Sequence, residues 1–188
     1  MQPPALARFG SLAAALTMLV VASPSVGAQQ GFMAVMHRNI TDVERKVVAL
    51  ANAIPESAYA WRPAEGVRSI GEVLQHIAAD NYILPVYMGT PAPAATGITA
   101  DYGTAVAYET RRGLTKAQIV ADLEASFAHL HRAINTNTDA NITQNIGWFG
   151  NQASRLQAMT GTVGHLHEHL GQLIAYARSN GVKPPWSN

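Results

Sequence analysis

Hydrophobic residues recur along the chain at the three- and four-residue spacing of amphipathic helices. The first helical pattern runs from Gly31 to Ile54. The second begins at Ser69, because Glu72 three residues later completes a capping box, and it should end between Pro85 and Gly89. The apolar positions of the two helices are Met36, Ile40, Val43, Val47, Leu50 and Ile54, then Ile70, Val73, Leu74, Ile77 and Leu84.

Two further helices are predicted in the second half of the chain. Thr115 can cap a third helix, which ends in the Asn- and Thr-rich segment from Asn135 to Asn145. A fourth helix is expected from about Asn151 to Ser179, where Asn180 and Gly181 terminate it. Their apolar stripes are Ile119, Leu123, Phe127, Leu130 and Ile134, then Leu156, Met159, Val163, Leu166, Leu170, Leu173 and Ala177.

The segment from Thr90 to Gly113 lacks a sustained helical period and is interpreted as a long connection. Such a length lets the chain travel back along the bundle, so that the third helix can run parallel to the second. The only β-like stretch, Ile98 to Tyr108, is broken by Gly103 and too isolated to build a sheet. The pattern predicts an all-α four-helix bundle with a long crossover between helices 2 and 3.

Residues 1–28 have the features of a secretory signal peptide. A cationic start ending at Arg8 precedes an apolar run from Leu12 to Ala22, and small residues follow at Val26 to Ala28. A membrane anchor is the alternative, but the run is much shorter than the ~20 residues that span a bilayer. We expect one domain over residues 29–188, located in the periplasm or secreted, with no membrane association after cleavage.

Composition narrows the possible chemistry. The chain has no cysteine, which excludes thiolate catalysis and cysteine metal sites. Its formal charge is +1 without a run of Lys or Arg, so nucleic-acid binding is not expected. Seven histidines are present, and three of them, His165, His167 and His169, lie close together in the fourth helix.

His165 and His169 are one helical turn apart on one face, the spacing that lets two imidazoles reach one ion. His167 projects to the opposite side, and the alternative is that all three simply decorate a solvated helix. His76 of the second helix supplies a third ligand, with Asp80 four residues later on its face. Three imidazoles suit Zn²⁺ best, and Ni²⁺ or Fe²⁺ can also occupy such a set.

Asp80 is the candidate catalytic residue. Its carboxylate could accept the second N–H of a ligand histidine or polarise a bound water, and its alternative role is that of a surface carboxylate.

The chain resembles the DinB-like metal-binding four-helix bundles over residues from about Phe32 to Pro185. The segments that carry the resemblance are Trp61-Arg62-Pro63, Ser69 to Ile77, His165 to Leu173, Tyr176-Ala177-Arg178 and Gly181 to Pro185. The resemblance implies that His76, His165 and His169 are metal ligands. It also implies a homodimer, which is frequent in this family. The superfamily includes thiol-dependent transferases and a mycothiol-dependent maleylpyruvate isomerase.

Three hypotheses for function follow from these observations. The first is a metal-dependent hydrolase or thiol transferase that acts on a small molecule, with Asp80 as the nearest proton acceptor. Export weighs against thiol transfer, because small thiol cofactors are mainly cytoplasmic. The second is a non-enzymatic protein that binds or scavenges metal, and the third is a structural metal that joins helices 2 and 4.

Overall fold

A computed structural model describes residues 31–187 of the chain, so the predicted signal peptide lies outside the described residues. Four long helices form a bundle, as predicted: α1 (Phe32–Ala53), α2 (Ile70–Tyr87), α4 (Lys116–Ile134) and α5 (Arg155–Ser179). The shorter elements are the 3-10 turns η1 (Glu56–Ala58) and η2 (Ala94–Thr96), the helix α3 (Tyr102–Glu109) and the strands β1 (Asn145–Trp148) and β2 (Asn151–Ser154).

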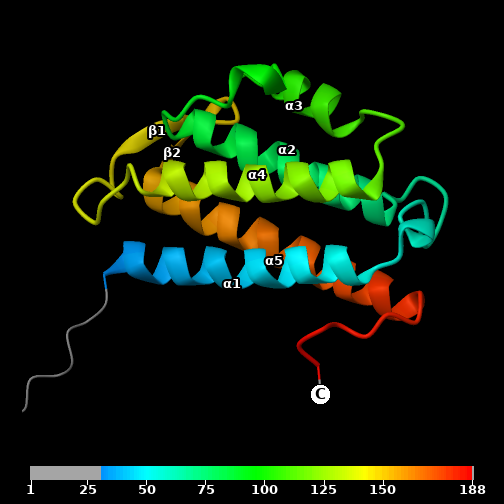
Figure 1. The fold of residues 1–188 in the computed structure, drawn as a ribbon. Helices are drawn as coiled ribbons and strands as arrows, with labels where there is room; N and C mark the ends of the chain where they lie inside the picture. Colours follow the sequence, from blue (N-terminus) through cyan, green and yellow to red (C-terminus); the bar gives the residue numbers. More distant parts are fainter. Residues whose placement is uncertain (1–30, 188) are drawn as a thin grey trace, which may run out of the picture.

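The directions of the helices confirm the long crossover. In Figure 1, α2 and α4 run in the same direction, whereas α1 and α5 run the opposite way. The chain therefore returns along the whole bundle between α2 and α4, as the length of residues 90–113 allowed. The antiparallel pair of α2 and α5 holds the predicted histidines on neighbouring helices.

The helices begin where their side chains can cap them. Ser69, Thr115 and Ser154 each accept a hydrogen bond from the backbone N–H three residues later, and the side chains of Glu72, Gln118 and Gln157 accept one from the backbone N–H of the cap residue. The apolar stripes face the core, except for Leu156 at the start of α5, which is exposed and corrects the prediction for that position. The fully buried large side chains of the core are Ile40, Leu50, Ile54, Ile70, Leu74, Ile77, Ile83, Leu123, Phe127, Leu130, Ile134 and Met159.

The connection between α2 and α4 is not wholly irregular, which corrects the prediction for residues 90–113. The β-like stretch overlaps the helix α3, which Asp101 caps by accepting a hydrogen bond from the backbone of Gly103. The helix has only 8 residues, too few to show a helical period in the sequence. It packs along α2 and covers a face of that helix that would otherwise meet solvent.

The start of the fourth helix is also corrected, from Asn151 to Arg155. Residues before it form an antiparallel hairpin, in which Trp148 pairs with Asn151 across a two-residue turn. Phe149 and Gly150 of this turn both have positive φ, 49° and 77°, as a type I′ turn requires. The bundle is therefore accompanied by one small two-stranded sheet within the described residues.

None of the helices in residues 31–187 has the length and apolar character needed to cross a lipid bilayer.

Candidate metal centre

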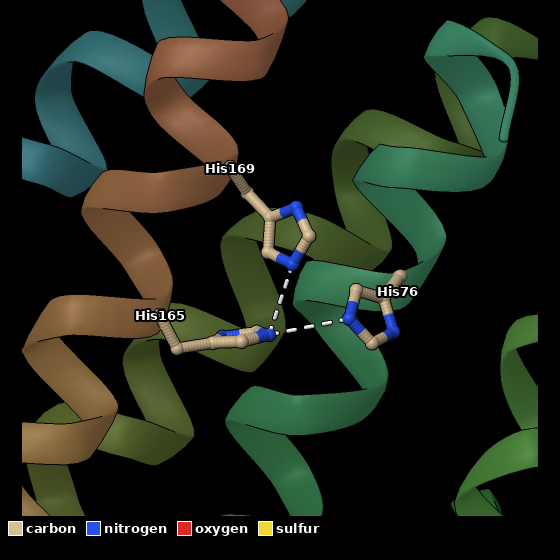
Figure 2. Close-up of side chains that lie close together, drawn as sticks. All are labelled: His76, His165 and His169. Atoms are coloured by element: carbon tan, nitrogen blue, oxygen red, sulfur yellow. Dashed lines mark hydrogen bonds between the residues drawn. The ribbon is translucent and has the colours of Figure 1, made fainter. Parts of the chain in front are cut away.

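Three histidines from two antiparallel helices meet beside the core. His76 comes from α2, and His165 and His169 lie one turn apart on α5. Their Nε2 atoms point toward one another, as Figure 2 shows, with His165 Nε2 3.2 Å from that of His76 and 3.0 Å from that of His169. His76 is buried and the other two are half-buried, at the margin of the apolar face. The three form the group in residues 31–187 that could hold a metal ion.

Hydrogen bonds on the outer sides of two rings turn their Nε2 atoms toward the centre of the cluster. The Nδ1–H of His76 donates to Glu109 and that of His169 to the Gln172 amide oxygen, and in these tautomers both Nε2 atoms present lone pairs. Only His165 Nε2 is left to carry a proton toward them. The nitrogen that would carry this proton lies 3.0 Å from Asp80 Oδ2, and the buried Nδ1 of His165 has no partner in either tautomer. A cation at the centre would satisfy all three Nε2 lone pairs.

The spacing of the nitrogens fits a small divalent ion. Zn–N bonds of roughly 2.0–2.1 Å in a tetrahedron place neighbouring ligand atoms about 3.3 Å apart. The two Nε2 separations at His165 are 3.2 and 3.0 Å. The side chains therefore already have nearly the arrangement that such an ion needs.

Asp80 lies on the same side as the ligand nitrogens. Its Oδ2 is 3.0 Å from His165 Nε2 and 3.6 Å from His76 Nε2, and its Oδ1 is buried without a hydrogen-bond partner. The carboxylate thus borders the centre of the cluster, and the Nδ1 atoms of His76 and His169 have other partners. The sequence suggested that Asp80 either accepts the second N–H of a ligand histidine or polarises a bound water. The geometry favours contact with a water bound to the ion.

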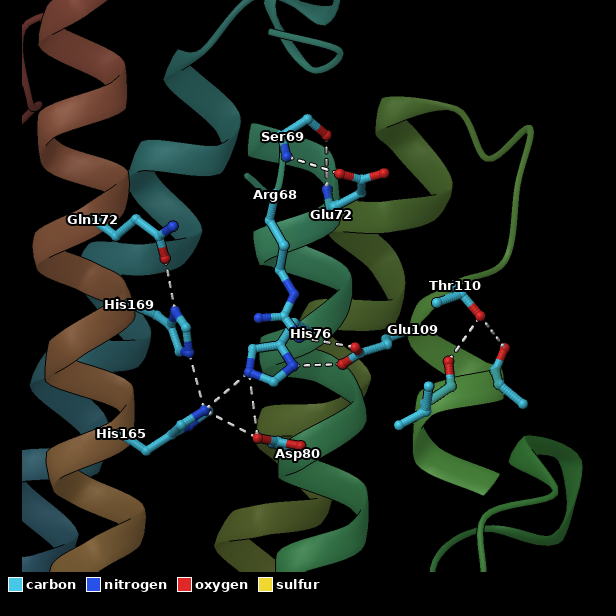
Figure 3. A network of polar contacts seen from close by, with 12 residues as sticks. Arg68, Ser69, Glu72, His76, Asp80, Glu109, Thr110, His165, His169 and Gln172 are labelled. Carbon is cyan, nitrogen blue, oxygen red and sulfur yellow. Dashed lines mark hydrogen bonds and ion pairs between the residues drawn. The ribbon is translucent and has the colours of Figure 1, made fainter. Parts of the chain in front are cut away.

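Glu109 of α3 is the residue that holds His76, and the sequence analysis did not identify it. Its Oε2 accepts from His76 Nδ1 over 2.5 Å, while Arg68 donates to its Oε1 over 3.0 Å (Figure 3). Burial raises the pKa of Glu109, but His76 and Arg68 outweigh it and hold the pKa below its ordinary value. The charged carboxylate therefore fixes the His76 tautomer with Nε2 free for a metal.

His169 is kept neutral by its surroundings. Burial lowers its pKa, the cationic forms of His165 and His76 and the charge of Arg68 lower it further, and the bond to Gln172 only partly opposes them. Gln172 is itself held by donating to the Tyr176 hydroxyl over 2.9 Å. Because metal ligation requires a neutral imidazole, this environment favours His169 as a ligand.

His167 lies apart from the cluster, as its position on the helix predicted. Its ring is exposed and its Nδ1 contacts the carbonyl of Val163 in its own helix. Of the three histidines on α5, His165 and His169 therefore face the site and His167 faces solvent.

The family model of the DinB superfamily matches residues 39–173, which include His76, Asp80, Glu109, His165 and His169. The chain belongs to the DinB superfamily. This confirms the resemblance inferred from the histidine motifs and their flanking segments. No curated protein matches the chain.

Solved structures of DinB-like proteins share the fold. A DinB-like protein of Bacillus cereus superimposes with a TM-score of 0.67 at 15% identity, over 81% of this chain and 95% of the other. A DinB-like protein of Bacillus subtilis gives 0.59 at 16%, over 79% and 92%. A conserved protein of Enterococcus faecalis gives 0.63 at 12%, over 80% and 97%. At these identities the similarity establishes the fold alone.

Proposed function

We propose that this DinB-superfamily protein binds one divalent metal ion through the Nε2 atoms of His76, His165 and His169 and uses it in hydrolysis or thiol transfer. The observation that carries the proposal is the convergence of three Nε2 atoms on one point, within the spacing of ligands around one ion. Zn²⁺ suits three imidazoles best, and Ni²⁺ or Fe²⁺ fit the same ligands.

The residues around the site have separate roles in this proposal. A bound ion would supply Lewis acidity, which activates a water or thiol nucleophile and polarises a substrate carbonyl. Asp80 Oδ2 lies beside two of the ligand nitrogens and would accept the proton that the nucleophile loses. Glu109 and Gln172 would keep the two rings oriented during this step.

Metal content tests the site directly. The purified protein should carry one ion per chain, and His76→Ala and His165→Ala should each lose it. His167→Ala is the matched control, because it removes a histidine from the same helix that faces solvent. Unchanged metal content in both ligand variants, or an equal loss in His167→Ala, would rule out the site.

The position of Asp80 also supports a second candidate function. At 3.0 and 3.6 Å from two ligand nitrogens, its carboxylate could itself bind the ion and close the fourth position. The protein would then store or scavenge metal, or use it to join α2 to α5, without turnover.

Asp80→Asn separates the two functions, since it keeps the shape of the side chain and removes its basicity. If Asp80 is a base, turnover of a responsive ester, amide or thiol-transfer substrate should fall by roughly 10²- to 10⁴-fold at unchanged metal affinity. If Asp80 is a ligand, the metal affinity itself should fall. If the metal-loaded protein turns over no ester, amide or thiol-transfer substrate, hydrolysis and thiol transfer are excluded as its function.

We further propose that the protein is exported, on the basis of the charged, apolar and small-residue segments before Gln29. N-terminal sequencing of the protein from the periplasmic fraction should start at Gln29. An intact Met1 in that fraction would contradict cleavage.

A further inference from the structure

Four aromatic side chains from three elements gather beside the end of α2. Phe149, at the tip of the hairpin, packs on Tyr87 of α2 and Tyr102 of α3, with ring centroids 4.8 and 5.6 Å apart. Trp148 lies beneath, 5.0 Å from Phe149 and 5.7 Å from Tyr87. Phe149 and Tyr102 remain 43% and 38% exposed, so large apolar surface stays in contact with water. We call Tyr87, Tyr102 and Phe149 the aromatic platform.

Phe149 occupies a backbone position that disfavours it. Its φ of 49° makes it the one non-glycine residue with positive φ in the described part of the chain. A two-residue turn of this kind prefers Asn before Gly, because Asn tolerates the left-handed region better than a bulky aromatic. The local conflict indicates that the Phe149 side chain has a role that the turn alone does not require.

The platform continues the face of α2 that carries the candidate metal centre. His76, Asp80 and Tyr87 follow one another at spacings of four and seven residues, which places all three on one side of the helix. Tyr87 lies roughly 10 Å along the axis from Asp80, at 1.5 Å per residue. On α3, Glu109 contacts His76 and Tyr102 lies seven residues earlier, on the same face of that helix.

Charges of the centre reach the platform. The pKa of the Tyr102 phenol is raised by burial first, then by the carboxylates of Asp80 and Glu109, with Arg68 acting in the opposite direction. The hydroxyl therefore stays protonated at neutral pH and can donate to an oxygen of a bound molecule. The aromatic platform and the candidate metal centre thus lie along one side of α2, close enough for their charges to interact.

We infer that the aromatic platform binds the flat apolar group of a small-molecule substrate whose polar end reaches the site formed by His76, His165 and His169. This inference rests on the proposed metal site. It assigns the substrate class: an aromatic or similarly flat apolar group joined by a chain of roughly 10 Å to a carbonyl-type group that a metal can bind.

A matched pair of probes tests the inference. 6-Phenylhexanohydroxamate and hexanohydroxamate share a metal-binding head and a chain, and only the first has a ring. In the zinc-loaded protein, the phenyl compound should bind more tightly by isothermal titration calorimetry. Phe149→Asn should lower the affinity for the phenyl compound roughly threefold to tenfold, as expected for one aromatic contact. The affinity for hexanohydroxamate should stay unchanged.

Two controls exclude indirect effects. Leu156→Ala removes another large apolar side chain that is exposed, at 36%, and should leave both affinities unchanged. Phe149→Asn should melt at or above the temperature of the unmutated protein, because Asn-Gly suits the turn. A markedly lower melting temperature would show that Phe149 serves stability, and would overturn the inference.

The remaining outcomes separate this inference from the proposed function. If hexanohydroxamate binds but the phenyl ring adds nothing, the platform is rejected and the metal site stands. If neither hydroxamate depends on zinc, while 6-phenylhexanol perturbs the tryptophan fluorescence of the metal-free protein but not of Phe149→Asn, the metal site fails and the platform stands. A dimer that Phe149→Asn converts to a monomer in sedimentation velocity, with unchanged probe affinity, would identify the platform as a subunit interface and overturn the inference.

Discussion

Glu109 determines how well His76 can bind a metal. Glu109→Gln keeps the shape of the side chain but removes the charge that holds the proton on His76 Nδ1 and pairs with Arg68. We expect the Zn²⁺ affinity to fall roughly 10- to 100-fold, the usual effect of losing such a partner of a ligand histidine. Competition with a chromogenic chelator measures the change.

Glu168→Gln is the control for that substitution. Glu168 lies on α5 between the ligand positions, but its side chain is exposed. The substitution therefore removes the same charge without changing a contact of the site. An equal fall in affinity for the two variants would show that net charge matters and the contact with His76 does not.

The residues of the site differ in how far the sequence reveals them. His165 and His169 are visible because both lie on one helix at a ligand spacing, and His76 because it flanks the core stripe of another. Glu109 is 33 residues from His76 and falls in a segment interpreted as a connection. Its contact exists only because α3 folds back along α2, which no local pattern encodes.

The start of α2 should respond to acid through a single side chain. Glu72 accepts a hydrogen bond from the backbone of Ser69 over 2.8 Å and pairs with Arg112 and Arg62 at 2.7 and 3.1 Å. The backbone bond and the two arginines together lower its pKa to about 2, against the burial that raises it. Since the pKa is lower in the folded state, this stabilisation is complete above about 4.5 and is lost as the pH falls through about 2.

Glu72→Gln should therefore destabilise the protein by about 1 kcal/mol at pH 7, the scale of exchanging charged hydrogen bonds for neutral ones, because Gln can still accept the N–H of Ser69. The difference from the unmutated protein should shrink as the pH approaches 2, when measured by urea unfolding. Glu65→Gln, in the exposed connector before α2, should show neither effect. A difference that stays constant from pH 7 to 2 would mean that the charge of Glu72 contributes nothing.

At the scale of elements, the long helices could be predicted and the short ones could not. A capping box at the start of α2, the cap Thr115 at α4 and apolar stripes extending over several turns predict both helices to within a residue or two. The hairpin before α5 was missed because its type I′ turn carries Phe149 in place of the usual Asn. The residue that hid this turn from the sequence pattern is also the one that the aromatic platform requires.

At the scale of the whole molecule, an ion at the candidate site would join α2 to α5, which are otherwise held together only by core packing. His76 and His165 are 89 residues apart in sequence, on the antiparallel helices α2 and α5. An ion that binds only the folded chain adds about 2.7 kcal/mol at a hundredfold excess over its Kd, and so should raise the melting temperature by roughly 5–10 °C.

This stabilisation should depend on the three histidines and on pH in a defined way. EDTA should remove it, and His169→Ala should melt at the same temperature with and without Zn²⁺, whereas His167→Ala should keep the full increase. Acid should also abolish it, because the imidazoles must lose their protons to bind an ion. The low pKa of His169 means that this ligand becomes protonated at a lower pH than an ordinary histidine, so its competition with protons is weak near neutrality. Calorimetry in which Zn²⁺ leaves the melting temperature of the unmutated protein unchanged at pH 7 would argue against any metal bridge between α2 and α5.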